Sequence, residues 1–268
     1  MIRTARYMSN VRMSALACVS LACLTATSAQ AQTAPTNPPV VHHWDSVAAA
    51  SVALTRGNSR SFLAAATVDT KGKYNFDEFL LGASAGYGDT TTHTSTGDVT
   101  TTTANYYKGY GQWNHLFTER FYAGIRLDGV HDAVADIHYR LTANPLAGYY
   151  LIKETNTDFS VEAGPSFVTE HIGDHYHSYV GERVAERFEH KFGTGAKIWE
   201  HVEWVSQATE FDNWFIDAEA GVSAPITKAL DVRLVVDDTY NNRPAGYGTS
   251  NARLKNDLKL LAGIGYRF

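Results

Sequence analysis

The final segment, residues 258–268, constrains the fold most tightly, because its apolar residues alternate up to the last position. One face of the segment carries an apolar series, which consists of Leu258, Leu260, Ala262, Ile264, Tyr266 and Phe268. The other face is small and cationic apart from Leu261. A period of two predicts an extended strand with two unlike faces, as an antiparallel sandwich strand would also have. A sandwich strand rarely ends the chain on two uncovered aromatic rings, whereas a strand facing lipid places them in an interfacial girdle.

The opposite end of the chain has the features of a secretory signal peptide. A segment with three arginines precedes the uncharged run 14–26, and Ala29 and Ala31 form a small-x-small cleavage site. The uncharged run is shorter than the roughly 20 apolar residues of a membrane-spanning helix. We therefore expect residues 1–31 to be cleaved after export through the secretory pathway. A lipoprotein signal is disfavoured, since no leucine stands three positions before Cys18 or Cys23.

Charge and cysteine content exclude several classes of protein for the mature chain. Both cysteines lie in the predicted leader, so the chain from Gln32 onward can form no disulfide. Three of the 23 basic residues also belong to the leader, which leaves 20 against 28 acidic residues and a net charge of −8. This acidic balance argues against nucleic acid as a partner. No segment after the leader has about 18 consecutive apolar residues, which excludes a helical membrane protein.

The mature chain consists of a short tail followed by one domain of alternating segments. Residues 32–43 contain several prolines and are expected to form a flexible periplasmic tail. Residues 44–268 contain twelve alternating segments, at 47–56, 59–70, 74–89, 102–115, 120–130, 137–151, 157–170, 179–192, 196–208, 213–224, 229–240 and 255–268. The predicted fold is all-β, a transmembrane antiparallel up-and-down barrel of about twelve strands. Ten strands are compatible with the sequence if short segments merge.

The connections between these segments differ in length on the two sides. Longer connections follow several odd-numbered segments, at 90–101, 131–136, 171–178 and 241–254, whereas short turns such as 71–73 follow the even-numbered ones. This asymmetry is typical of bacterial outer-membrane barrels, whose long loops lie outside the cell. An even number of strands places both termini in the periplasm. The threonine-rich segment 90–101 is expected to be a mobile loop without a binding role.

Apolar and charged residues separate onto opposite faces in most segments. Phe121, Ile125 and Leu127 would contact lipid, while Arg126 and Asp128 would point inward. The inward charges that we expect to line the lumen are Arg126, Asp128, Arg140, Asp158, Glu162, Arg183, Arg187, Asp217, Glu219, Arg233, Asp237, Lys259 and Arg267. These charges either orient small solutes along a path or form a packed network of ion pairs. A narrow or closed lumen is favoured, because many inward side chains are large and no long internal loop is evident.

The segment 179–192 fits the two-faced pattern least well. Glu182, Glu186 and His190 interrupt the face that would contact lipid. Either a β-bulge restores the register, or this strand extends beyond the bilayer.

Two groups of histidines provide candidate sites at the predicted outer rim. His131, Asp132 and His138 form one group, and His171, Asp174, His175 and His177 form the other. No nucleophile motif accompanies either group, so we expect no enzymatic activity and assign no catalytic residue. His171, His175 and His177 have the donors for Zn²⁺ or Cu²⁺, but a solvated polar loop is the favoured interpretation. No cofactor is expected.

Several short motifs resemble those of a bacterial family. The motifs are residues 52–59 (Val-Ala-Leu-Thr-Arg-Gly-Asn-Ser), 144–150 (Asn-Pro-Leu-Ala-Gly-Tyr-Tyr), 162–166 (Glu-Ala-Gly-Pro-Ser) and 263–268 (Gly-Ile-Gly-Tyr-Arg-Phe). Over residues 45–268 the chain resembles the salt-induced outer-membrane proteins, whose domain is known as domain of unknown function 481. Gly57 and Asn58 suit a tight turn with positive φ. The resemblance implies architecture and location, and it brings no catalytic residues.

The resemblance also implies partners and a working hypothesis for function. Tyr266 and Phe268 resemble the terminal aromatic signal that the barrel assembly machinery recognises. Outer-membrane lipid and lipopolysaccharide would surround the barrel, and small solutes are candidate ligands. The first hypothesis is solute passage or envelope maintenance under salt or osmotic stress. The alternative is a structural or surface-interaction barrel with a closed lumen, and an outer-membrane hydrolase is the least favoured role.

Overall fold

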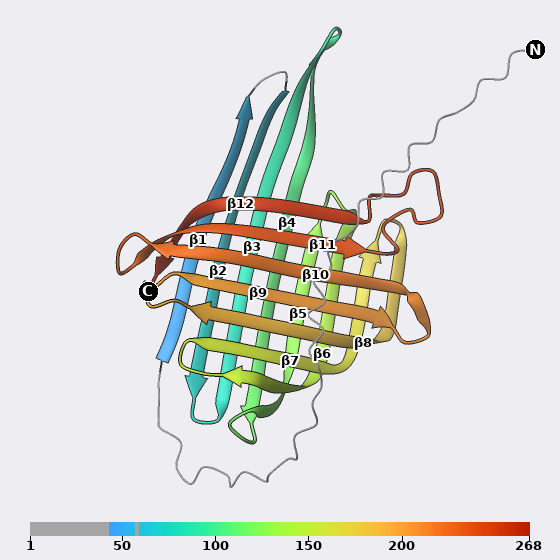
Figure 1. Ribbon diagram of the computed structural model, residues 1–268. Coiled ribbons are helices and arrows are strands. Elements are labelled where there is room, and N and C mark those ends of the chain that lie inside the picture. Colours follow the sequence, from blue (N-terminus) through green and yellow to red (C-terminus); the bar gives the residue numbers. More distant parts are fainter. Residues whose placement is uncertain (1–42, 57–58) are drawn as a thin grey trace, which may run out of the picture. The chain divides into compact units, whose positions relative to one another are not determined.

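The computed structural model describes residues 43–56 and 59–268, which form one closed antiparallel β-barrel (Figure 1). Its strands are β1 (His43–Arg56), β2 (Ser59–Tyr74), β3 (Asp77–Thr94), β4 (Gly97–Leu116), β5 (Phe121–Asp132), β6 (Ile137–Lys153), β7 (Thr157–Ile172), β8 (His175–Lys191), β9 (Lys197–Gln207), β10 (Glu210–Pro225), β11 (Leu230–Asn241) and β12 (Asn256–Arg267). Each strand pairs with its neighbours in sequence, and β1 pairs with β12. The predicted twelve-stranded, all-β barrel is confirmed.

The barrel closes where β1 meets β12, in a register that runs from Val47 opposite Arg267 to Ser51 opposite Gly263. A Cβ added at Gly263 would collide with the backbone oxygen of Ala50. Glycine therefore allows the two terminal strands to approach at the seam, and the closed ring leaves no free strand edge. We call the end of the barrel with His43 and Arg267 the termini end, and the opposite end the loop end.

The leader and its cleavage site lie outside the described residues. This applies to the expected signal peptide, with Ala29 and Ala31, and to the tail as far as residue 42. Strand β1 begins at His43, the last residue of the expected tail. The tight turn expected at Gly57 and Asn58 also lies outside the described residues.

The outer surface of the barrel is apolar over several strands. Large side chains that are exposed on this surface include Val52, Leu81, Leu127, Leu141, Phe167, Val184, Leu234, Leu260 and Ile264. Exposure of such a continuous apolar surface to water is unfavourable, whereas contact with lipid acyl chains is favourable. Aromatic pairs lie toward each end, with Tyr266 stacked on Phe268 and Trp214 stacked on Tyr240. The surface thus has the apolar band and aromatic girdles of a membrane-spanning barrel. Among the described residues, no helix is long and apolar enough to cross a membrane.

Two connections differ from the sequence-based expectation. The turn expected at 71–73 is part of β2, and the chain reverses at Asn75, whose φ is 53°. Gly72 lies under the Trp44 ring, so this glycine serves close packing and does not form a turn. The threonine-rich segment is an extension of the β3–β4 hairpin and not a mobile loop, with Thr91 bonded to Thr100 at 2.8 Å between hydroxyl oxygens. Its β-branched side chains favour paired strands.

Strand β8 contains no bulge. Its registers with β7 and β9 run without a shift, so the first of the two alternatives, a β-bulge, is wrong, and the extension of the strand beyond the bilayer stays a prediction. Glu182 and Glu186 consequently share the outer face of β8 with Val184, which is half exposed.

Candidate functional site

The predicted lumen charges lie on the strand faces opposite the exposed apolar side chains. They make contacts inside the barrel, within one strand, with neighbouring strands or across the lumen. The group consists of Arg126, Asp128, Arg140, Asp158, Glu162, Arg183, Arg187, Asp217, Glu219, Arg233, Asp237, Lys259 and Arg267. The alternation that segregates these charges also places them around a common interior, which is the candidate site.

Arg183 of β8 is the most deeply buried charge in the lumen. Its side chain has 0% exposure and donates to Glu162 of β7 at 2.9 Å and to Glu203 of β9 at 2.7 Å. Tyr122 and Gln112 donate to the second oxygen of Glu162 at 2.9 Å and 2.7 Å. A guanidinium with two carboxylates and two neutral donors forms a dense charge-assisted network. This part of the lumen is filled by side chains.

Two further interactions extend this network across the lumen. Arg126 of β5 lies 2.8 Å from Asp128 and 3.7 Å from Glu203 of β9. Arg187 of β8 donates to Gln112 of β4 at 3.4 Å. These contacts join strands that are four apart in the ring. They therefore connect strands that are not neighbours in the barrel wall.

Lys108 makes the longest connection across the interior. Its ammonium group donates to Asp217 of β10 at 3.3 Å, to Asp237 of β11 at 3.4 Å and to Thr239 at 3.2 Å. Lys108 belongs to β4, which lies opposite β10 in the closed strand order. An ammonium has three donor protons, and three acceptors occupy them here. Lys108 therefore links β4 to β10 and β11 across the interior of the barrel.

A second set of contacts crosses the lumen at the termini end. Lys71 of β2 lies 3.4 Å from Asp158 of β7, with side-chain exposures of 45% and 35%. Tyr150 of β6 donates to the buried Glu78 of β3 at 2.6 Å, and Lys153 lies 3.5 Å from the same carboxylate. The Lys71 pair is partly solvated and therefore weaker than the buried pairs.

The remaining predicted basic residues pair with carboxylates on the same or the adjacent strand. Arg140 donates to Glu170 at 2.6 Å and lies over the Phe215 ring at 4.1 Å. Arg233 and Arg267 both bind Asp231, at 2.6 Å and 3.1 Å. Lys259 pairs with Asp257 and lies 4.9 Å from the centre of the Tyr106 ring.

Part of the lumen remains accessible to water. Asp69 of β2 and Glu219 of β10 face the interior and are exposed. Tyr110 donates to Asp69 at 3.2 Å, and Trp199 donates to Glu219 at 2.6 Å. Solvent therefore reaches carboxylates beside the packed network.

The loop between β11 and β12 contacts the start of β10 and the β7–β8 turn at the loop end of the barrel. Arg243 forms ion pairs with Glu210 and Asp212 at the start of β10. Ala245 is buried, and a Cβ added at Gly173 in the β7–β8 turn would lie 3.6 Å from its methyl group. The loop 242–255 thus reaches from β11 past the start of β10 to the β7–β8 turn.

One member of each histidine group meets the other, since the rings of His138 and His171 stack with their centroids 4.3 Å apart. His131 interacts with the backbone oxygen of His138 at 2.8 Å, while Asp132 is buried and accepts hydrogen bonds from the next turn. The polar loop expected for the second group is wrong, because His171 lies in β7 opposite Tyr176 of β8, and His175 and His177 lie in β8 on the face opposite to Tyr176. Within residues 43–56 and 59–268, no group of three or more histidine, cysteine, aspartate or glutamate side chains could hold a metal ion.

Several lumen residues were missed in the sequence analysis. Gln112, Lys108 and Glu203 lie on alternating positions of β4 and β9, so the period of two could have identified their face. The sequence pattern places Lys71 in a turn and therefore does not indicate that its side chain points inward from β2. Nothing in the sequence indicates which opposite strand each side chain would reach.

The closed ring, the apolar exterior and the charged interior define a transmembrane β-barrel. Residues 48–268 match the model of the family described as "Protein of unknown function, DUF481". The chain belongs to this family. The terminal aromatics Tyr266 and Phe268 fall within the matched region and are exposed on the outer face.

Several solved β-barrels are similar to the chain in shape but not in sequence. The NanC porin is 8% identical with a TM-score of 0.49, covering 84% of this chain and 100% of that chain. The KdgM porin is 9% identical with a TM-score of 0.42, covering 83% and 99%. The translocator domain of autotransporter NalP from Neisseria meningitidis is 12% identical with a TM-score of 0.41, covering 84% and 87%. No curated protein sequence matches the chain. Similarities this distant support no inference about activity.

Proposed function

We propose that the protein is a bacterial outer-membrane barrel whose lumen is closed at rest by side chains that join opposite walls. In this proposal the chain is exported through the secretory pathway and both termini are periplasmic. Outer-membrane lipid and lipopolysaccharide surround the apolar band, and the assembly machinery recognises Tyr266 and Phe268. The protein would act as a structural element of the envelope, and the proposal includes no catalytic step.

The contacts of Lys108 carry the proposal of a closed lumen. One ammonium group reaches three acceptors on β10 and β11 from the opposite wall. An ion moving along the axis would have to displace a side chain that lies among two carboxylates and a hydroxyl. The buried Arg183 network and the loop 242–255 add two further obstructions, one within the lumen and one over its loop end.

A second candidate function is passage of small polar solutes under salt or osmotic stress. The exposure of the lumen-facing Asp69 and Glu219 favours this role, because part of the interior is already wet. Salt screens exposed charges more than buried ones. The partly exposed Lys71–Asp158 pair would therefore weaken first as ionic strength rises, which would link passage to salt.

Planar-bilayer conductance separates the two candidates. The mature protein should show no discrete conductance steps at moderate voltage and 0.15 M salt. A variant that combines Lys108→Ala with replacement of residues 243–254 by a short glycine-serine linker should conduct. A Lys228→Ala variant, altered in an exposed turn, is the matched control and should remain silent.

Two results would contradict the closed-lumen proposal. Regular steps from the folded wild-type protein would favour solute passage instead. A silent double variant, folded as shown by its circular dichroism, would mean that neither Lys108 nor the loop blocks the lumen.

A further inference from the structure

The outer face of β8 and β9 carries acidic side chains where lipid is expected. Glu186 on β8 and Glu200 on β9 both face outward, and they are diagonal neighbours, because Glu186 pairs with Val202 and Glu200 pairs with Phe188. The flanking outer faces of β10, β11 and β12 are apolar through Val222, Leu234, Leu260 and Ile264. Charges on a lipid-facing surface are unfavourable, so two neighbouring carboxylates there need an explanation.

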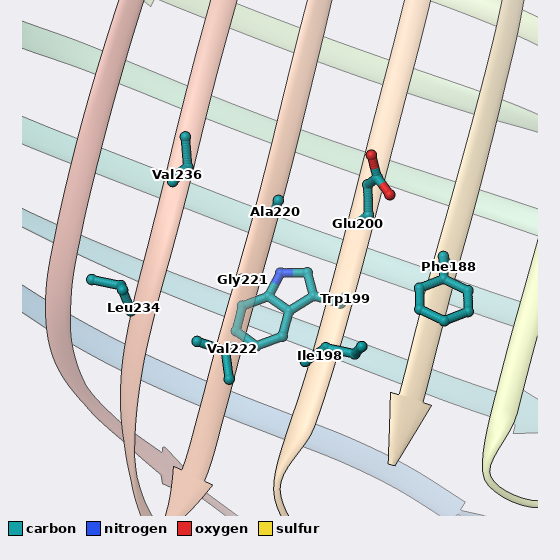
Figure 2. Close-up of a pocket in the computed structure, with 9 residues that line it drawn as sticks. All are labelled: Phe188, Ile198, Trp199, Glu200, Ala220, Gly221, Val222, Leu234 and Val236. Carbon is teal, nitrogen blue, oxygen red and sulfur yellow. The ribbon is translucent and has the colours of Figure 1, made fainter. Parts of the chain in front are cut away.

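A hollow of about 370 Å³ lies beside these carboxylates on the same outer face (Figure 2). It is lined by Phe188, Ile198, Trp199, Glu200, Ala220, Gly221, Val222, Leu234 and Val236. Ala220 pairs with Glu200 on one side and with Val236 on the other, and its small side chain leaves room between larger neighbours. Figure 2 shows the Glu200 carboxylate projecting at one edge of this hollow. The hollow therefore combines an apolar floor with a single acidic edge.

The described residues offer these carboxylates no cation. No ion pair or side-chain hydrogen bond involves the carboxylate of Glu186 or of Glu200 within residues 43–56 and 59–268, although the interior carboxylates nearby are paired. The flanking outer faces of β10 to β12 present no lysine or arginine in the apolar band, so a second copy docked through them would not neutralise the charge. The medium that faces these carboxylates is the surrounding membrane, which can supply a complementary cation.

We propose that this hollow is a binding site for one phospholipid with a primary ammonium headgroup, of the phosphatidylethanolamine class. An acyl chain would occupy the apolar hollow, and the ammonium group would donate hydrogen bonds to Glu200 and Glu186. A primary ammonium has three donor protons, and charge-assisted hydrogen bonds to carboxylates are stronger than neutral ones. The site lies on the outside of the barrel, so it does not depend on whether the lumen conducts.

The test compares lipids that differ only in the headgroup. Folded mature protein in detergent is titrated with phosphatidylethanolamine, phosphatidylcholine or phosphatidylglycerol with identical acyl chains, and native mass spectrometry counts the bound lipids. Choline has a similar charge but no N–H donor. Wild-type protein should retain one phosphatidylethanolamine molecule. Its affinity for this lipid should exceed its affinity for phosphatidylcholine by a factor of roughly five or more, as expected for a partly solvated ion pair.

Three variants distinguish the parts of the site. Glu200→Gln combined with Glu186→Gln should abolish the preference, and Ala220→Leu should weaken retention by filling the hollow while leaving the carboxylates in place. Glu182→Gln is the matched control, since Glu182 lies on the same face of β8 but pairs with Ser206, farther along β9 from Glu200 than Glu186 is. Equal retention of phosphatidylethanolamine and phosphatidylcholine by the wild-type protein would overturn the proposal. Unchanged preference in the double glutamine variant, or dimers in place of bound lipid, would also overturn it.

Discussion

Replacement of Arg183 by methionine is the most direct test of the buried charge network. Methionine keeps much of the aliphatic volume but removes the hydrogen bonds to Glu162 at 2.9 Å and to Glu203 at 2.7 Å. Loss of one partner from a buried charge network costs about 3–5 kcal/mol, because the remaining charges stay uncompensated. We expect a loss of about 3 kcal/mol in the free energy of unfolding, since Arg126 remains 3.7 Å from Glu203.

The measurement is reversible urea unfolding of the mature protein in lipid vesicles, followed by tryptophan fluorescence. An Arg60→Met variant, altered at an exposed position near the loop end, should stay within about 0.5 kcal/mol of wild type. Adding Glu203→Gln to Arg183→Met should recover part of the loss, because one unpaired charge is removed. Suppose that Arg183→Met lowers the free energy of unfolding by less than about 1 kcal/mol and leaves its slope against urea concentration unchanged. This result would refute the view that Arg183 neutralises a buried pair of carboxylates.

Three further changes test other contacts. Tyr150→Phe removes the 2.6 Å hydrogen bond to the buried Glu78 and should lower the free energy of unfolding by about 1–3 kcal/mol in the same assay. If the variant is as stable as the wild-type protein, water replaces the hydroxyl. Gly263→Val should impair closure of the barrel, measured as slower migration of the unheated protein in gels. Gly109→Ala should leave the migration unchanged, because its added Cβ would lie 3.7 Å from the nearest atom. Equal effects of the two changes on migration would argue against a steric cause. Phe268→Ala should lower the amount of barrel assembled in cells, while refolding of the purified protein into vesicles should stay normal. A parallel loss in both assays would indicate a purely structural role for this exposed ring.

Much of the architecture follows from local alternation. The period of two in β5, β7, β10 and β12 identifies both faces of each strand, because a lipid-facing surface and a polar interior impose opposite requirements on successive residues. The same rule correctly separates Arg126 from Leu127 and Lys259 from Leu260. It requires no knowledge of which strands meet across the barrel.

The differences from the structure arise where alternation carries less information. Gly72 and its lysine neighbours have the composition of a turn, but the Trp44 ring packs on this glycine within β2. The outward Glu186 suggested a bulge, yet the register of β8 is continuous. At Gly72 the packing of the Trp44 ring outweighs the local preference for a turn.

The contacts across the lumen could not be predicted from the sequence. Lys108 and Asp217 are 109 residues apart, and Lys71 and Asp158 are 87 apart. Their proximity depends on the stagger of all the strands around the ring, which the faces of individual strands do not specify. For the same reason the sequence leaves open whether the inward charges line a path or close it.

The separation of a lipid-facing exterior from a polar interior is the central claim, and site-directed quenching tests it directly. The predicted mature chain has no cysteine, so single cysteines at Leu260 and Glu219 can each carry a fluorophore in vesicles that contain nitroxide-labelled lipid. Leu260 is 55% exposed on the outer face, whereas Glu219 faces the lumen. The label at Leu260 should be strongly quenched and the label at Glu219 should not. Equal quenching at both positions, or quenching only at Glu219, would contradict this arrangement of the barrel.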